Sequence, residues 1–161
     1  MLAYISDANI LIDVEVGGLI APMFSLGYRF FVPDVIYWEE LAEHHAHWLG
    51  LGLQIQSLSG EGVARVQALS IKHKRPSRND LFALALAEQA QCPLLTGDAA
   101  LRGAAEAERI EVKGTVWLVT EMLRKQCINP TVARAAFDRM RQEGRRLPWA
   151  SVDKALQKEE G

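Results

Sequence analysis

The sequence predicts an α/β protein, a three-layer α/β/α sandwich around a mostly parallel central sheet. Short apolar runs alternate along the 161 residues with longer segments whose apolar residues recur at helical spacing. Strands that alternate with helices favour a parallel sheet covered on both faces. Hydrophobic residues make up 49% of the chain and charged residues 24%, which is typical of a globular domain.

Five short apolar runs are the predicted strands. The third of them, LQIQSL, alternates apolar and polar residues, which favours a strand at the edge of the sheet. The runs at 2–6, 29–32 and 93–96 are more continuously apolar, as buried strands are. The runs lie at residues 2–6, 29–32, 53–58, 93–96 and 109–113.

The intervening segments are predicted helices with recognisable ends. Gly17 and Gly18 end the first helix, and Pro33 stands where a helix commonly starts. Ser77 and Asp80 have the spacing of a capping box, with Asp in place of the usual Glu. The predicted helices cover residues 8–16, 19–27, 34–49, 61–73, 80–90, 99–108 and 131–144. The last of them is one of two or three helices that close the chain.

Composition excludes several classes of protein. A net charge of −2 argues against a protein that coats nucleic acid, although it permits an enzyme that acts on one. No apolar run approaches the roughly 20 residues of a membrane span, and the N-terminus lacks the basic region of a signal peptide. Cys92 and Cys127 lie too far apart for a recognisable disulfide framework. We therefore expect a cytoplasmic protein without a membrane anchor.

Acidic residues follow several of the predicted strands. Asp7 comes directly after the first strand, and Asp98 follows the fourth by one glycine. Asp80 opens the helix before that fourth strand, while Glu39 and Glu40 lie in the helix after the second. Ligands of parallel sheets bind at the carboxyl ends of strands, so these side chains are expected at one edge.

Two explanations fit these acidic residues. Asp7 and Asp98 are good helix N-caps, Asp80 suits a capping box, and the glutamates suit a solvated face. Carboxylates gathered at one edge, however, repel one another, and a divalent cation removes that cost. Oxygen ligands suit Mg²⁺ or Mn²⁺, which activates water and stabilises charge on a phosphodiester.

Four segments in the same order resemble the PIN-domain nucleases, and within them the small single-domain VapC-like type. They are YISDANILID, FFVPDVIYWEEL, SRNDLFALALAEQ and PLLTGDAALR, and the resemblance covers roughly residues 2 to 120. It implies a PIN-like sandwich with a nuclease core at residues 1–125. Residues 126–161 are then a C-terminal helical extension of the same domain.

The resemblance also implies roles for individual residues. The catalytic residues are Asp7, Glu40, Asp80 and Asp98. Of these, Asp7, Asp80 and Asp98 hold the metal, and Glu40 binds it or orients the attacking water. Glu40 is preferred to Glu39 because it precedes Leu41. The supporting polar residues are Asn9, Thr96, Ser77 and Asn79. Many relatives have a further acidic residue after Thr-x-Asp, but Ala99, Ala100 and Leu101 follow here, which weakens any second metal position.

The expected function is a divalent-metal-dependent endoribonuclease, with an RNA substrate and Mg²⁺ or Mn²⁺ as cofactor. The resemblance further implies the toxin of a toxin–antitoxin pair, an antitoxin partner and a homodimer. One alternative is a non-catalytic PIN-like module that binds RNA or protein. A response-regulator-like domain is disfavoured, because that class has paired aspartates after its first strand and Asp7 stands alone.

Two further clusters remain open to two interpretations. The segment KHKRPSR leads into Asp80, so a basic loop would grip RNA beside the metal, unless it is only a solvated helix end. The expected RNA-binding residues are Lys72, Lys74, Arg75 and Arg78. His44, His45 and His47 suit either a transition-metal site or, more simply, a solvated or partner-facing helix.

Overall fold

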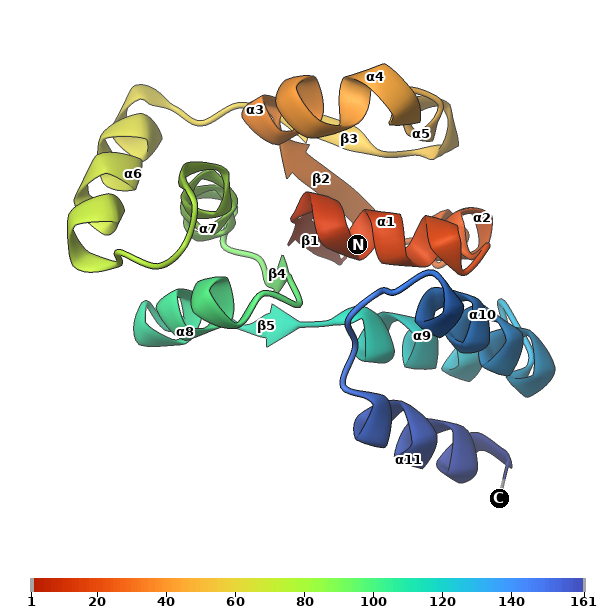
Figure 1. The fold of residues 1–161 in the computed structure, drawn as a ribbon. Helices are drawn as coiled ribbons and strands as arrows, with labels where there is room; N and C mark the ends of the chain where they lie inside the picture. The colour runs from red at the N-terminus through yellow and green to blue at the C-terminus, as the bar shows by residue number, and fades with distance from the viewer. Residues whose placement is uncertain (1, 161) are drawn as a thin grey trace.

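Five parallel strands form one sheet in the order β3-β2-β1-β4-β5 (Figure 1). The structure is a computed structural model that describes the backbone of residues 2–160 and the side chains of residues 2–158. Its strands are β1 (Ala3–Ser6), β2 (Arg29–Pro33), β3 (Gln54–Gln56), β4 (Leu94–Leu95) and β5 (Val112–Lys113). The parallel sheet and the edge position of β3 confirm the predictions. The strand order reverses between β1 and β4, which is where parallel sheets bind ligands.

Helices cover both faces of the sheet, as predicted (Figure 1). α7 contacts β1, β2 and β4 and packs against α6, while α1 packs against α2, α9 and α10 on the opposite side. The helices of these layers are α1 (Ala8–Val16), α2 (Ile20–Phe24), α6 (Gly60–Lys72), α7 (Arg78–Ala90), α8 (Ala99–Ala107), α9 (Thr115–Arg124) and α10 (Pro130–Gln142).

The single helix predicted for residues 34–49 is wrong in detail. That segment is divided into α3 (Asp34–Ile36), the π-helical turn η1 (Tyr37–Leu41), α4 (Ala42–His45) and, after a break, α5 (Trp48–Leu51). A wide hydrogen bond from the Ala42 N–H to the Tyr37 carbonyl closes η1. Apolar periodicity reports which face is buried but not an inserted residue, so the wide turn escaped sequence analysis.

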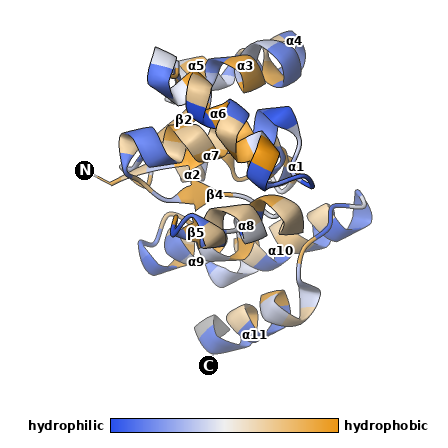
Figure 2. Cartoon of the chain, turned by 90° about the vertical axis from the view of Figure 1, so that its left-hand side faces the viewer, coloured by the Kyte–Doolittle hydropathy of each residue, from blue (hydrophilic) through white to orange (hydrophobic). Residues whose placement is uncertain are grey.

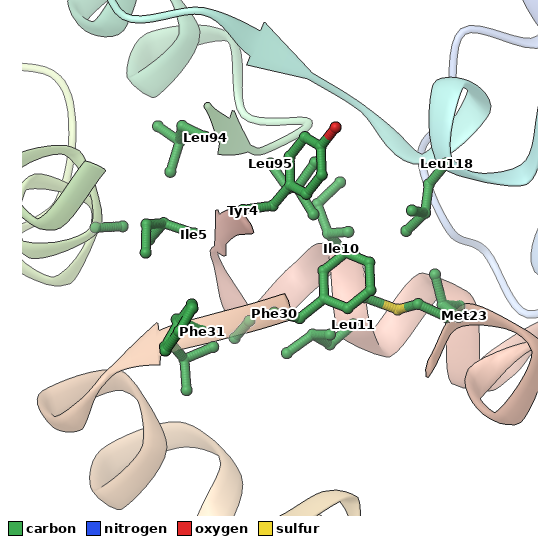
Figure 3. Packing of buried hydrophobic residues seen from close by; sticks show 14 of the residues in the cluster. Tyr4, Ile5, Ile10, Leu11, Met23, Phe30, Phe31, Leu94, Leu95 and Leu118 are labelled. Atoms are coloured by element: carbon green, nitrogen blue, oxygen red, sulfur yellow. The ribbon is translucent and has the colours of Figure 1, made fainter. Parts of the chain in front are cut away.

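The core lies on both faces of the sheet (Figure 3). Ile5, Phe31 and Leu94 point toward α7, whereas Tyr4 and Phe30 point toward α1 and α9. This alternation follows from the two-residue repeat of a strand. Figure 2 shows the hydrophobic colouring of β4, whose two leucines are fully buried. Burial of each large apolar side chain contributes about 1.5–3 kcal/mol.

The C-terminal helices pack onto this core. α10 contacts α1 and α9, and α11 (Trp149–Glu160) contacts α9 and α10. Val152 and Leu156 of α11 are buried in the same cluster as the strand residues. The division of the chain at residue 125 stays a prediction. Along residues 2–160, no helix combines the length and the apolar character needed to cross a membrane.

An ion-pair cluster joins α6 to the end of α8. The Glu108 carboxylate lies 2.7 Å from Arg65 Nη2, Lys72 Nζ and His73 Nε2, and its side chain is 8% exposed. Hydrogen bonds from Lys72 and His73 are the main cause that lowers the pKa of Glu108 to about 2.

We expect this cluster to stabilise the fold at neutral pH and to fail in acid. A lowered pKa in the folded state contributes stability above the unfolded value of 4.5, and that stability is lost as pH falls toward 2. Glu108→Gln should therefore reduce the free energy of unfolding by about 2 kcal/mol at pH 7, after discounting for the exposure of Lys72.

Urea denaturation at pH 7 and pH 2.5 measures this effect. The difference in the free energy of unfolding between wild type and Glu108→Gln should be smaller at pH 2.5 than at pH 7. Glu106→Gln, an exposed position on the same helix, is the matched control and should change stability little. An equal gap at both pH values would contradict the assignment.

Candidate functional site

Three aspartates stand at the starts of three helices. Asp7 Oδ1 accepts a hydrogen bond from the Ile10 N–H (2.9 Å) at the start of α1, and Asp98 Oδ1 accepts one from the Leu101 N–H (2.8 Å) at the start of α8. Asp80 and Ser77 form the expected capping box at the start of α7. A capping hydrogen bond therefore accounts for the position of one carboxylate oxygen of each aspartate. The positive ends of the helix dipoles also offset part of the repulsion between these carboxylates.

Thr96 joins two of these aspartates from inside the protein. Its hydroxyl is fully buried, donates to Asp7 Oδ2 (2.5 Å) and accepts a hydrogen bond from the Asp98 N–H (3.1 Å). Asp7 is only 4% exposed, and this burial raises the pKa of its carboxyl to about 6 despite the bonds from Thr96 and Ile10. The negative charge of Asp80 raises it further. A cation placed near these groups would act in the opposite direction.

A cavity of about 520 Å³ opens where these helices begin, and we call it the carboxylate cavity. Glu40 enters from η1, and its Oε2 accepts a hydrogen bond from Asn79 Nδ2 (3.0 Å). Both Glu39 and Glu40 line the cavity, whereas the buried Asp7 does not and is linked to it through Thr96. The lining residues are Asn9, Glu39, Glu40, Ser77, Arg78, Asn79, Asp80 and Asp98.

The oxygen-bearing side chains at the cavity are of the type that binds a hard divalent cation, but they do not surround an ion completely. Across residues 2–158, no three carboxylate, imidazole or thiol groups converge closely enough to hold a metal by themselves. Mg²⁺ keeps several waters and typically takes one or two protein carboxylates together with substrate phosphate. Asp80 and Asp98 meet that requirement from two helices. The open cavity thus suits an ion that binds with waters and substrate.

The predicted RNA-binding residues lie in different surroundings. Arg78 lines the carboxylate cavity, with its guanidinium 4.7 Å from the centre of the Phe82 ring. Lys74 lines a cavity between α6 and α7 that shares Arg78 with the carboxylate cavity, and Arg75 is exposed. Lys72 pairs with Glu108, so part of its charge is already neutralised. Of the four predicted RNA-binding residues, only Arg78 lines the carboxylate cavity.

The histidines of the 43–48 segment have structural partners. His45 Nδ1 lies 2.9 Å and His47 Nε2 lies 3.1 Å from the two carboxylate oxygens of Glu15. The His45 ring also stacks on Trp48 with a centroid distance of 4.1 Å. These contacts explain the two histidines as a link between α1 and the segment that follows η1, without a metal ion.

Sequence analysis missed a contact between the C-terminal extension and the site. Arg145 Nε donates to Asp13 Oδ1 (2.6 Å), and Arg145 Nη2 donates to Asn9 Oδ1 (3.3 Å) beside the carboxylate cavity. Asp13 is buried and also accepts a hydrogen bond from Thr115 Oγ1 (2.9 Å). The available signal was a carboxylate three residues after Ile10, on the buried face of an apolar helix.

Comparisons with known proteins agree with this architecture. The PilT N-terminus domain protein SSO1118 from Sulfolobus solfataricus P2 is 14% identical, with a TM-score of 0.52 over 76% of this chain and 94% of that one. PAE2754 from Pyrobaculum aerophilum is 13% identical, with a TM-score of 0.55 over 74% of this chain and 95% of that one. At these identities the likeness concerns the fold alone.

No curated protein matches the chain. A family model described as a PIN domain (DUF3368) matches residues 3–160, which includes the C-terminal helices as well as the segments around the carboxylate cavity. A match over nearly the whole chain shows the family. The chain therefore belongs to the PIN domain family.

Proposed function

We propose that this protein is a divalent-metal-dependent endoribonuclease. The proposal depends on one observation above all, the cavity at the switch point of the sheet that Glu40, Asp80 and Asp98 line together. PIN domains are typically nucleases and generally use divalent metals. A module that only binds RNA gains nothing from carboxylates beside the phosphate backbone, since they repel it.

Several residues at the cavity have a chemical role in this proposal. Asp7, Asp80 and Asp98 would hold Mg²⁺ or Mn²⁺, which would supply an activated water and neutralise charge on the phosphodiester. Glu40, positioned by Asn79, accepts a proton from the attacking water or orients it. Arg78 lies at the rim, where its guanidinium can hold a non-bridging phosphate oxygen.

Asp7, the third of these proposed ligands, is buried and is connected to the cavity through Thr96. Its hydrogen bond with Thr96 fixes the start of α8, and the same Thr96 hydroxyl accepts from the Asp98 N–H. The carboxylate of Asp7 also adds negative potential that favours a cation nearby. Asn9 lies between this aspartate and Arg145, which orients its amide.

Cleavage of labelled RNA tests the proposal. A mixed pool of transfer, ribosomal and messenger RNA fragments should be cut in the presence of Mg²⁺ or Mn²⁺, and excess chelator should stop the reaction. Restored cutting after the metal is added back would exclude chelator damage to the protein. Folded protein, free of any inhibitor, that cuts no RNA with either metal would favour the non-catalytic module.

The proposal extends to a toxin with an antitoxin partner and a homodimeric state. Its support is the resemblance of the four motif segments to the small VapC-like nucleases. Exposed hydrophobic residues on α6, Val63 and Ile71, leave apolar surface available on that side of the molecule (Figure 2).

A further inference from the structure

The carboxylate cavity continues into two others. A second cavity of about 330 Å³ shares Asn9 and Asp98 with it. A third, of about 750 Å³, shares Gly97 and Arg146 with the second and reaches the start of α11. We call the third cavity the C-terminal groove. In Figure 1 the segment between α10 and α11 passes the junction of β5 and α9, where this groove lies.

The C-terminal groove is lined by cations from three different elements. Arg146 comes from the loop before α11, Arg102 from α8 and Lys113 from β5. Arg146 is exposed and has no hydrogen-bond or ion-pair partner among the described residues. Among the side chains of residues 2–158, Arg102 makes only a long bond of 3.5 Å to the Thr96 carbonyl, and no carboxylate there pairs with it. Two guanidinium groups are therefore available to an anion.

The acidic residues of the C-terminal groove do not cancel this charge. Arg145 neutralises Asp13 at 2.6 Å, and Glu106 is the other carboxylate in the lining. Lys113 pairs with the exposed Glu111 at 2.9 Å. The groove thus keeps a net positive charge next to a cavity that is net negative.

The passage between the two regions is open at Gly97. A Cβ built on this glycine would meet no atom within 4 Å. Gly97 lines both the second cavity and the C-terminal groove, immediately before Asp98. The space beside Gly97 is therefore open, and Gly97 itself places no side chain between the two cavities.

We propose that the C-terminal groove binds backbone phosphates of the RNA strand that enters the carboxylate cavity, with Arg102 and Arg146 as the contacts. This inference rests on the proposed nuclease function. A nucleic acid cut internally must continue beyond the cleaved bond, and guanidinium groups hold phosphates well. Continuity with the carboxylate cavity favours RNA over an acidic protein segment.

In this proposal, RNA binds mainly at the C-terminal groove and less at the basic loop before α7. In that loop only Arg78 borders the carboxylate cavity, and Lys72 is paired. The C-terminal extension instead provides Arg146 and holds the loop through Arg145. The extension is thereby part of the substrate-binding surface.

Binding of a fluorescently labelled single-stranded RNA dodecamer, measured by anisotropy in excess chelator, tests the inference without cleavage. Arg102→Glu/Arg146→Glu should weaken binding at least about tenfold. The slope of log affinity against log salt should also fall in magnitude by about 1.4, because each of the two lost phosphate contacts contributes about 0.7. Arg102→Gln/Arg146→Gln should give a smaller loss in the same direction.

Lys154→Glu/Lys158→Glu on α11 is the matched control, since it changes the net charge equally at exposed positions outside the C-terminal groove. Binding by the groove variant within twofold of wild type, or an equal loss in the control, would overturn the inference. The cleavage test gives a separate result. If the protein cuts RNA with metal but the groove variant binds RNA as wild type does, only the role of the groove is refuted. If the groove variant loses RNA binding but the wild-type protein cuts no RNA, only the nuclease function is refuted.

Discussion

Asp98→Asn should abolish RNA cleavage while the protein stays folded. Asparagine caps a helix as well as aspartate does, so the hydrogen bond to the Leu101 N–H can persist. The lost negative charge, however, weakens the hold on a divalent cation at the point where phosphate charge develops. We expect cleavage to fall at least about a hundredfold, which corresponds to about 3 kcal/mol of transition-state stabilisation.

Three measurements make this result specific. Thermal denaturation should give nearly the same midpoint for Asp98→Asn and wild type. Asp98→Ala should lose both the cap and the activity, at about 1 kcal/mol of stability. Asp138→Asn, an exposed change of the same charge on α10, should cut RNA at the wild-type rate. A wild-type rate for Asp98→Asn would reduce Asp98 to a helix cap.

Arg145→Ala should destabilise the fold by about 3 kcal/mol. It leaves the Asp13 carboxylate, which is 7% exposed, without its cation. Removal of one partner from a buried ion pair costs far more than removal of both, because an uncompensated charge remains. The hydrogen bond from Thr115 stays but cannot neutralise the charge.

Urea denaturation of single and double variants measures the effect. Asp13→Asn added to Arg145→Ala should recover part of the loss, since the amide carries no charge. Arg75→Ala, at an exposed position, should change the free energy of unfolding by less than about 0.5 kcal/mol. A similarly small effect for Arg145→Ala, or no recovery in the double variant, would show that the pair is not structurally important.

Local sequence features predicted much of the fold. Apolar runs located the strands, and the aspartates and Ser77 located the starts of α1, α7 and α8. Both signals act over a few residues, through burial and through the free N–H groups of a helix terminus. The wide turn at Tyr37–Leu41 and the break before Trp48 have no comparable signal.

The candidate site was predictable only as a set of nearby carboxylates. Sequence analysis did not show that Asp7 is buried and hydrogen-bonded to Thr96, 89 residues away. Nor did it show that Lys72 faces Glu108 or that Arg145 reaches Asp13, 132 residues away. Such partners are chosen by tertiary packing, which local periodicity does not encode.

The hydrogen bond between Thr96 and Asp7 also bears on how the protein is made. Chains grow from the N-terminus, so Asp7, Glu40 and Asp80 are added to the chain before Thr96 and Asp98. β1 acquires its neighbour β4 only after that point, when the pairing of Ile5 with Leu94 becomes possible. An unfinished chain of about 90 residues thus has acidic groups but no assembled centre. For the proposed nuclease, this order of synthesis means that the site cannot assemble before Asp98 has been added.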